Sequence, residues 1–280
     1  MIYLDAQSLR QLQLTELELL QEADRVAKKY HITYCIIAGT MLGAVRHGGF
    51  IPWDDDLDFF MPRQDYERLK TLWADTAQYT LAWPSEDYND HNMFMTLRHK
   101  GTTLVRPYQQ GLDIVHGVCL DIFPLDGCPM GLRRWGQLFW GSVYQLYCAQ
   151  LVPEHHGKPV ALLGRLLLAV VPSAGARYQL WRMAERRMSR YPIRQCHYVT
   201  EICAGPRYMK NRYPATAFAS AVWVPFQGTA LPIPVGYDAY LTMAFGDYMT
   251  PPPPAGRVPA HQALLLDTER PYTHYMGEKQ

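Results

Sequence analysis

Four aspartates stand within five positions of PWDDDLDFF, the segment that spans residues 52–60. They are Asp54, Asp55, Asp56 and Asp58. Side chains alternate between the two faces of a β-strand, so Asp54, Asp56 and Asp58 would share one face if a strand begins that early. Carboxylates crowded in this way raise one another's pKa or require a cation. Because the segment contains no Lys or Arg, a divalent metal that prefers oxygen ligands, Mg²⁺ or Mn²⁺, is the simplest partner.

Two other interpretations of the acidic run compete with a metal site. A solvated acidic turn is the usual fate of such a run, but the apolar residues on both sides argue against it. A calcium loop of the EF-hand type needs Gly at its sixth position, whereas the sixth residue counted from Asp54 is Phe59. The sequence therefore excludes the EF-hand and favours a metal site.

A further carboxylate, Asp121, interrupts the apolar segment VCLDIFP at 118–124. A lone acid among apolar residues is costly unless it is paired or bound to a metal. We expect its strand to lie beside the strand of Asp56 and Asp58, because such a set can hold divalent ions against a polyphosphate. Asp121 or Asp54 could also accept the proton of an attacking hydroxyl, and the apolar neighbours of Asp121 favour Asp121.

Gly39 and Thr40 follow an apolar stretch and precede a short predicted helix over 41–47. Backbone N–H groups at such a helix N-terminus bind phosphate readily. Arg46 and His47 end this helix, and together with Arg98 they are the side chains that we expect to neutralise phosphate. This turn, followed about 16 residues later by the acid pair, indicates phosphoryl or nucleotidyl transfer.

Hydrophobic periodicity predicts the elements that must position these residues. The predicted helices cover residues 8–29, 41–47, 63–74, 132–151, 160–190 and 237–245. The predicted strands cover residues 33–38, 55–61, 93–98 and 117–123, with a hairpin over 221–234. The prolines at 251–254 predict an extended surface tail. We therefore predict an α/β (α+β) fold in which helices flank a mixed sheet, as a single domain over 1–280 with a helical insertion at about 130–192.

One stretch of the insertion, VALLGRLLLAVV at 160–171, is apolar but too short to span a bilayer. We interpret it as a buried core helix, and a helix that rests in a membrane interface is the alternative.

Bulk composition narrows the class of protein. The 280 residues contain 27 Lys and Arg against 26 Asp and Glu, which provides no overall positive field for nucleic acid. The N-terminus lacks the pattern of a secretory signal, and the six cysteines contain no C-x-x-C pair. We expect a cytoplasmic protein, with peripheral contact at the inner face of the membrane as an alternative.

Three blocks of the sequence resemble the LicD family. The first and most specific is GTMLGAVRHGGFIPWDDDLDFFMPRQDYERL at 39–69. The second is VCLDIFPLDG at 118–127, and the third is FQGTALPIPVGYDAYLTMAFGDYMTPPP at 226–253. Together they extend over most of the chain. The resemblance implies a nucleotidyltransferase-like fold.

The resemblance also implies a reaction, the transfer of phosphocholine from CDP-choline to a hydroxyl of a cell-surface glycan. The glycan would be a teichoic acid, a lipopolysaccharide or another polysaccharide, or the precursor of one, with a lipid-linked acceptor as an option, and CMP would leave. By motif position, Gly39 and Thr40 correspond to the phosphate-binding turn, Asp56 and Asp58 to the Mg²⁺ or Mn²⁺ pair, and Asp121 to the third carboxylate. Trp53, Asp54 and Asp55 would support these ligands or contact choline.

Three alternatives to phosphocholine transfer stay open. Fukutin-type relatives transfer ribitol phosphate, so the donor could be CDP-ribitol or CDP-glycerol. A true nucleotidyltransferase would use the same metal site but release pyrophosphate. A catalytically silent scaffold, associated with glycans or a membrane, would show no metal-dependent response to a CDP donor.

Overall fold

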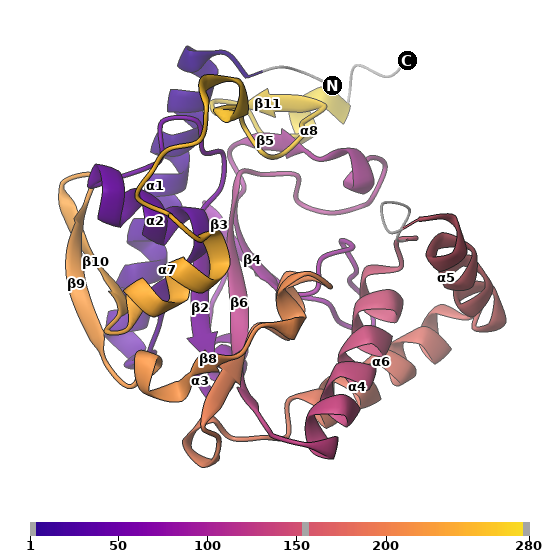
Figure 1. Cartoon of the computed structure of the whole chain (residues 1–280). Helices are drawn as coiled ribbons and strands as arrows, with labels where there is room; N and C mark the ends of the chain where they lie inside the picture. Colours follow the sequence, from indigo (N-terminus) through magenta and orange to yellow (C-terminus); the bar gives the residue numbers. More distant parts are fainter. Residues whose placement is uncertain (1–3, 153–156, 277–280) are drawn as a thin grey trace. The chain divides into compact units, whose positions relative to one another are not determined.

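The computed structural model describes residues 4–152 and 157–276. The chain forms two compact units (Figure 1). Unit 1 comprises Met1–Ala82, Thr96–Phe123 and Thr216–Gln280, and unit 2 comprises Trp83–Met95 and Pro124–Ala215. The predicted insertion at about 130–192 falls within unit 2.

A sheet forms the centre of unit 1. Its strands lie in the order β1 (Cys35–Ile36), β2 (Asp58–Pro62), β6 (Cys119–Cys128), β4 (Met95–His99) and β3 (Tyr79–Ala82). Strand β1 pairs antiparallel with β2, and β3 pairs antiparallel with β4. Leu57, Phe59 and Phe60 are fully buried, so the residues around the aspartates anchor this part of the core. The predicted α+β class, with helices flanking a sheet, is confirmed.

The other elements of unit 1 surround this sheet. The helices are α1 (Ala6–Tyr30), α2 (Ala38–His47), α3 (Arg63–Leu72), α7 (Tyr237–Phe245) and α8 (Thr273–Met276). The predicted hairpin is confirmed as β9 (Ala221–Phe226) and β10 (Thr229–Pro234). Its turn residues, Gln227 and Gly228, both have positive φ, as a type I′ turn requires. Strand β5 (Thr103–Val105) pairs with β11 (Leu265–Asp267), which ties the C-terminal segment to unit 1 (Figure 1).

Several predicted boundaries near the aspartates were wrong. Strand β2 begins at Asp58 rather than at residue 55, and its neighbour β1 pairs only with Phe59 and Phe60. Asp54 and Asp56 therefore precede the strand instead of sharing a face of it. Helix α2 already begins at Ala38, so Gly39 and Thr40 lie in its first turn.

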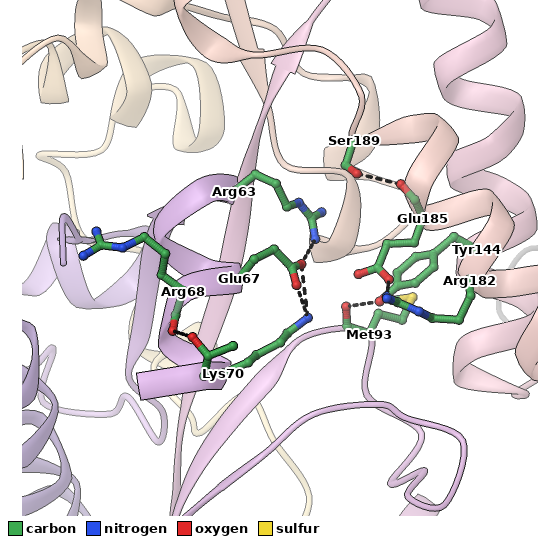
Figure 2. A network of polar contacts seen from close by, with 10 residues as sticks. Arg63, Glu67, Arg68, Lys70, Met93, Tyr144, Arg182, Glu185 and Ser189 are labelled. Atoms are coloured by element: carbon green, nitrogen blue, oxygen red, sulfur yellow. Dashed lines mark hydrogen bonds and ion pairs between the residues drawn. The ribbon is translucent and has the colours of Figure 1, made fainter. Parts of the chain in front are cut away.

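The described part of unit 2 contains the α-helices α4 (Leu132–Ala149), α5 (Lys158–Val170) and α6 (Ala174–Met188), so the helical stretch predicted over 160–190 consists of two helices. The C-terminal half of β6 pairs with β7 (Tyr198–Thr200), and β7 pairs with β8 (Tyr213–Pro214). Tyr144 and Trp181 pack in an apolar cluster formed largely by α4 and α6. The Tyr144 hydroxyl donates to the Met93 carbonyl at 2.8 Å, and Arg182 pairs with Glu185 (Figure 2). Polar contacts thus stabilise the packing of these helices.

Helix α5 is not the buried core helix that we expected. It buries only Ala161, Gly164 and Leu168. Within the described ranges no single helix is long and apolar enough to cross a membrane. Helices α5 and α6 satisfy that test as a pair, but they bend by 115° at the break between them.

The proline-rich tail is only partly extended. The prolines at 251–254 are exposed, as predicted, but Pro254–Gly256 forms a short 3-10 turn.

Candidate active site

Asp56 and Asp58 lie where the loop after α2 enters the sheet of unit 1. The backbone N–H of Asp58 donates to the hydroxyl of Thr40 at 2.9 Å, which couples α2 to the first residue of β2. The main-chain carbonyl of Asp58 accepts a hydrogen bond from the N–H of Ile37 at 3.1 Å. The first turn of α2 therefore fixes the position of Asp58.

Asp121 lies on β6, the strand next to β2. Its N–H donates to the carbonyl of Leu57 at 2.9 Å, between the two aspartates of the predicted metal pair. Asp58 and Asp121 thus lie on neighbouring strands, and Asp56 lies in the loop before β2.

Asp54 occupies the space beside the N-terminal turn of α2. A Cβ on Gly39 would lie 2.7 Å from the Oδ2 atom of Asp54, so any other residue at this position would displace this carboxylate. Gln13 of α1 donates to the main-chain carbonyl of Asp54 at 3.0 Å and holds the loop. Among the described residues, no group forms a hydrogen bond with the buried Oδ2 atom. A buried carboxylate oxygen in this state is ready to bind a cation.

Asp55 is held by the C-terminal segment of unit 1. It is buried, and its two oxygens accept from the N–H groups of Ala260 at 3.1 Å and His261 at 2.9 Å. The His261 Nδ1 atom lies 3.1 Å from Asp55 and 3.5 Å from Asp56. Burial alone would raise the pKa of Asp55, but its contacts with His261 outweigh burial and lower it.

The carboxylates repel one another strongly. Burial and then the charge of Asp56 raise the pKa of Asp54 to about 8. Burial also raises the pKa of Asp56, and it raises that of Asp58 well above the usual range, with Asp56 and Asp121 adding to the effect on Asp58. For Asp121, burial raises the pKa to about 6 against the attraction of Arg106. So many destabilised carboxylates in one place are the electrostatic signature of a functional site.

Arg106 is the main cation of this cluster, and sequence reasoning missed it. Burial would lower its pKa, but Cys119 and Asp121, followed by Tyr108 and Asp56, raise it. Its position between Val105 and Pro107 was the available signal, because a charge in an apolar context needs a partner.

Arg98, which we expected to contact phosphate, is instead fully buried. It donates to the Thr96 hydroxyl at 2.9 Å and to the Val115 carbonyl at 3.0 Å. These contacts favour a structural role for Arg98 and leave Arg106 as the stronger candidate for a cation at the site.

Glu16 of α1 is a second residue that the sequence reasoning missed. It is buried, and among the described residues its Oε2 atom forms no hydrogen bond. Burial raises its pKa well above the usual range, and the charges of Asp56, Asp54 and Asp55 add to the effect. Glu16 follows Leu12 by four residues on the buried face of α1, and this position was the available signal.

Arg46, His47 and Trp53 surround the C-terminal end of α2. Arg46 donates to the Tyr248 carbonyl at 2.8 Å and to His47 at 3.0 Å. The ring of Trp53 contacts His47 edge-on at 6.3 Å, and the guanidinium of Arg257 lies 5.5 Å from the centre of the Trp53 ring. Trp53 therefore already has a cation over its ring, the type of contact that choline would make.

The residues present fit a divalent cation. Single ligand atoms of Asp55, Asp56 and His261 all lie within 4.8 Å of one another. The unpartnered oxygen of Asp54 belongs to the same loop. A cation would relieve the repulsion that raises the pKa values of Asp54, Asp56 and Asp58.

Comparison with known proteins places this site in a family. The pattern described as LicD/FKTN/FKRP, nucleotidyltransferase domain, matches residues 31–129, which include every site residue predicted from the sequence. The lipopolysaccharide cholinephosphotransferase LicD of Haemophilus influenzae is 27% identical, over 92% of this chain and 98% of that protein. An uncharacterized protein of Rickettsia prowazekii is 31% identical over 38% of this chain and 31% of its own length. Another, from Rickettsia typhi, is 46% identical over 17% of this chain and 16% of its own length. Residues 31–129 therefore match the nucleotidyltransferase domain of the LicD family, and the chain is similar to a LicD cholinephosphotransferase along nearly its whole length.

Proposed function

We propose that this protein transfers phosphocholine from CDP-choline to a hydroxyl of a cell-surface glycan, with lipopolysaccharide as the first acceptor to test, and that CMP leaves. The observation that carries the proposal is the set of half-buried carboxylates around Asp56, Asp58 and Asp121, whose pKa values are raised by loss of solvent and by one another's charge. The match to the Haemophilus cholinephosphotransferase along nearly the whole of both chains supports this choice of substrates.

In this proposal the three carboxylates have distinct roles. Asp56 and Asp58 would hold Mg²⁺ or Mn²⁺, which would neutralise the donor pyrophosphate and the charge that develops on the leaving oxygen. Asp121 is our candidate to accept the proton of the acceptor hydroxyl. Its pKa of about 6 keeps it ionised at neutral pH yet close enough to neutrality to take a proton.

The backbone and the cations would position the donor. The N–H groups in the first turn of α2 have no side-chain cap, and the turn itself contains no acidic residue, so they can receive phosphate oxygens once a cation neutralises the adjacent Asp54. Arg106 would add positive charge near Asp56 and Asp121, and Arg46 would add positive charge near Asp54. Trp53 would offer an aromatic face to the choline ammonium in exchange for its contact with Arg257.

The central experiment measures CMP release from CDP-choline with Mg²⁺ and a lipopolysaccharide acceptor. We expect Asp56→Asn to abolish transfer and the matched change Asp113→Asn, at an exposed aspartate, to leave it intact. Full activity of a folded Asp56→Asn protein would refute the assignment of the metal pair.

Two further measurements separate the alternatives. Calorimetric titration with CDP-choline, CDP-ribitol and CDP-glycerol, each with Mg²⁺, ranks the donors, and the proposal requires CDP-choline to bind most tightly. Product analysis distinguishes phosphocholine transfer, which releases CMP, from nucleotidyl transfer, which releases pyrophosphate.

A further inference from the structure

The outward face of helix α5 in unit 2 is apolar over its whole length. Five of its large side chains are 40–77% exposed. They are Leu162, Leu163, Leu166, Leu167 and Val170. At about 3.6 residues per turn, most of them project away from the buried stripe of Ala161, Gly164 and Leu168. A helix on a water-facing surface normally carries polar residues there, so this face is unusual.

The helix is held firmly in place. The Tyr147 hydroxyl of α4 donates to the Leu167 carbonyl at 2.8 Å. Arg177 of α6 donates to the carbonyls of Leu168 at 3.0 Å and Val171 at 2.6 Å, and these bonds satisfy the C-terminal end of α5. The exposed leucines are therefore presented by an anchored helix.

The helical part of unit 2 is rich in basic residues. Residues 130–192 contain nine Lys and Arg against two Glu, although the whole chain is nearly neutral. Lys158 and Arg165 are exposed on α5 itself, Arg186 and Arg187 are exposed on α6, and Arg190 is exposed just after α6. A second copy of the chain would bring the same excess of positive charge to this face. Apolar side chains beside basic ones instead match an anionic lipid surface, which offers both hydrocarbon and negative charge.

We propose that α5 is a membrane-binding helix that lies in the interface of an anionic bilayer, with its outward leucines at the level of the acyl chains and the basic residues of α5 and α6 at the headgroups. The proposal does not depend on the reaction, because none of these residues belongs to the candidate active site.

The test is co-sedimentation of the full chain with two kinds of vesicle, one of phosphatidylglycerol and phosphatidylcholine in equal parts and one of phosphatidylcholine alone. We expect binding to the anionic vesicles that weakens as salt rises. The double change L163E/L166E should lower the partition coefficient at least about tenfold, because two apolar contacts become charged. The control L14E alters a leucine of α1 in unit 1 that is 45% exposed, and it should bind like the unmodified protein. Circular dichroism checks that both variants are folded.

Three results would overturn the proposal. They are a failure of the unmodified protein to bind anionic vesicles, an equal loss of binding in L14E, and a lipid-free dimer that L163E/L166E dissociates. The last result would assign the face to a second copy of the chain. CMP release in solution from a detergent-free acceptor should be unchanged in L163E/L166E, and its loss would show that α5 serves something other than membrane contact.

Discussion

Replacing Asp121 with Asn removes one charge from the carboxylate cluster with almost no change in shape. The Asn side chain resembles the protonated carboxyl, so the variant reports what it costs the fold to hold Asp121 ionised. Burial raises the pKa of this group from 3.8 to about 6, and that value already includes the attraction of Arg106.

The magnitude and its pH window follow from this shift. At about 1.4 kcal/mol per pKa unit, ionised Asp121 lowers the free energy of unfolding by up to about 3 kcal/mol. Because the folded-state pKa is the higher one, the penalty is absent below about pH 4, grows up to about pH 6 and is constant above that. We therefore expect Asp121→Asn to stabilise the metal-free protein at pH 8 by about 1–3 kcal/mol, which corresponds to a rise in Tm of about 3–10 °C.

The assay is thermal unfolding in EDTA across pH 4.5–8 at constant ionic strength, repeated with Mg²⁺. Divalent cation should stabilise the unmodified protein and should stabilise Asp121→Asn less, because one ligand charge is missing. Asp113→Asn, at an exposed aspartate, is the matched control and should change neither curve. A lower Tm for Asp121→Asn at pH 8 without metal, or a shift that does not depend on pH, would refute the argument that burial makes ionised Asp121 costly to the fold.

Two more substitutions test how α2 positions the site. Gly39→Ala places a Cβ 2.7 Å from the Asp54 carboxylate, so CMP release should fall at least about tenfold, as expected for a misplaced group. Gly136→Ala, where a Cβ meets no atom within 4 Å, should leave activity unchanged, and equal rates for the two variants would contradict the steric argument. Thr40→Val leaves the N–H of Asp58 without its acceptor and should destabilise the fold by about 1–3 kcal/mol in urea unfolding, whereas Thr40→Ser should keep the bond. If the Ser and Val variants are equally stable, this hydrogen bond does not fix Asp58.

The types of residue at the site could be read from local sequence. Asp56 belongs to an acidic run, whereas Asp58 and Asp121 each interrupt an apolar segment, and that pattern predicted neighbouring strands with a cation between them. The helices were predicted with comparable success, because apolar spacing reflects which face of one element is buried. Boundaries were less accurate at β2 and α2, since the length of a strand depends on its partner and not only on its own residues.

Only the tertiary structure revealed the partners from distant parts of the chain. His261 reaches Asp55 from about 200 residues away because the segment after α7 returns to the sheet, and no local pattern records that path. Arg106 and Glu16 carried signals in their apolar contexts, but their proximity to the carboxylates depends on how α1 and the segment after β5 pack.

Helix α5 shows most clearly which features follow from the sequence and which depend on the tertiary structure. Its composition determined that it is an apolar helix too short to cross a bilayer. The sequence could not determine whether its leucines face a core or the surface, because an apolar residue has the same preference for burial in protein and in lipid. The contacts of α5 with Tyr147 and Arg177 decided the question. They hold one narrow side of α5 against the rest of unit 2 and leave the opposite face of the helix exposed.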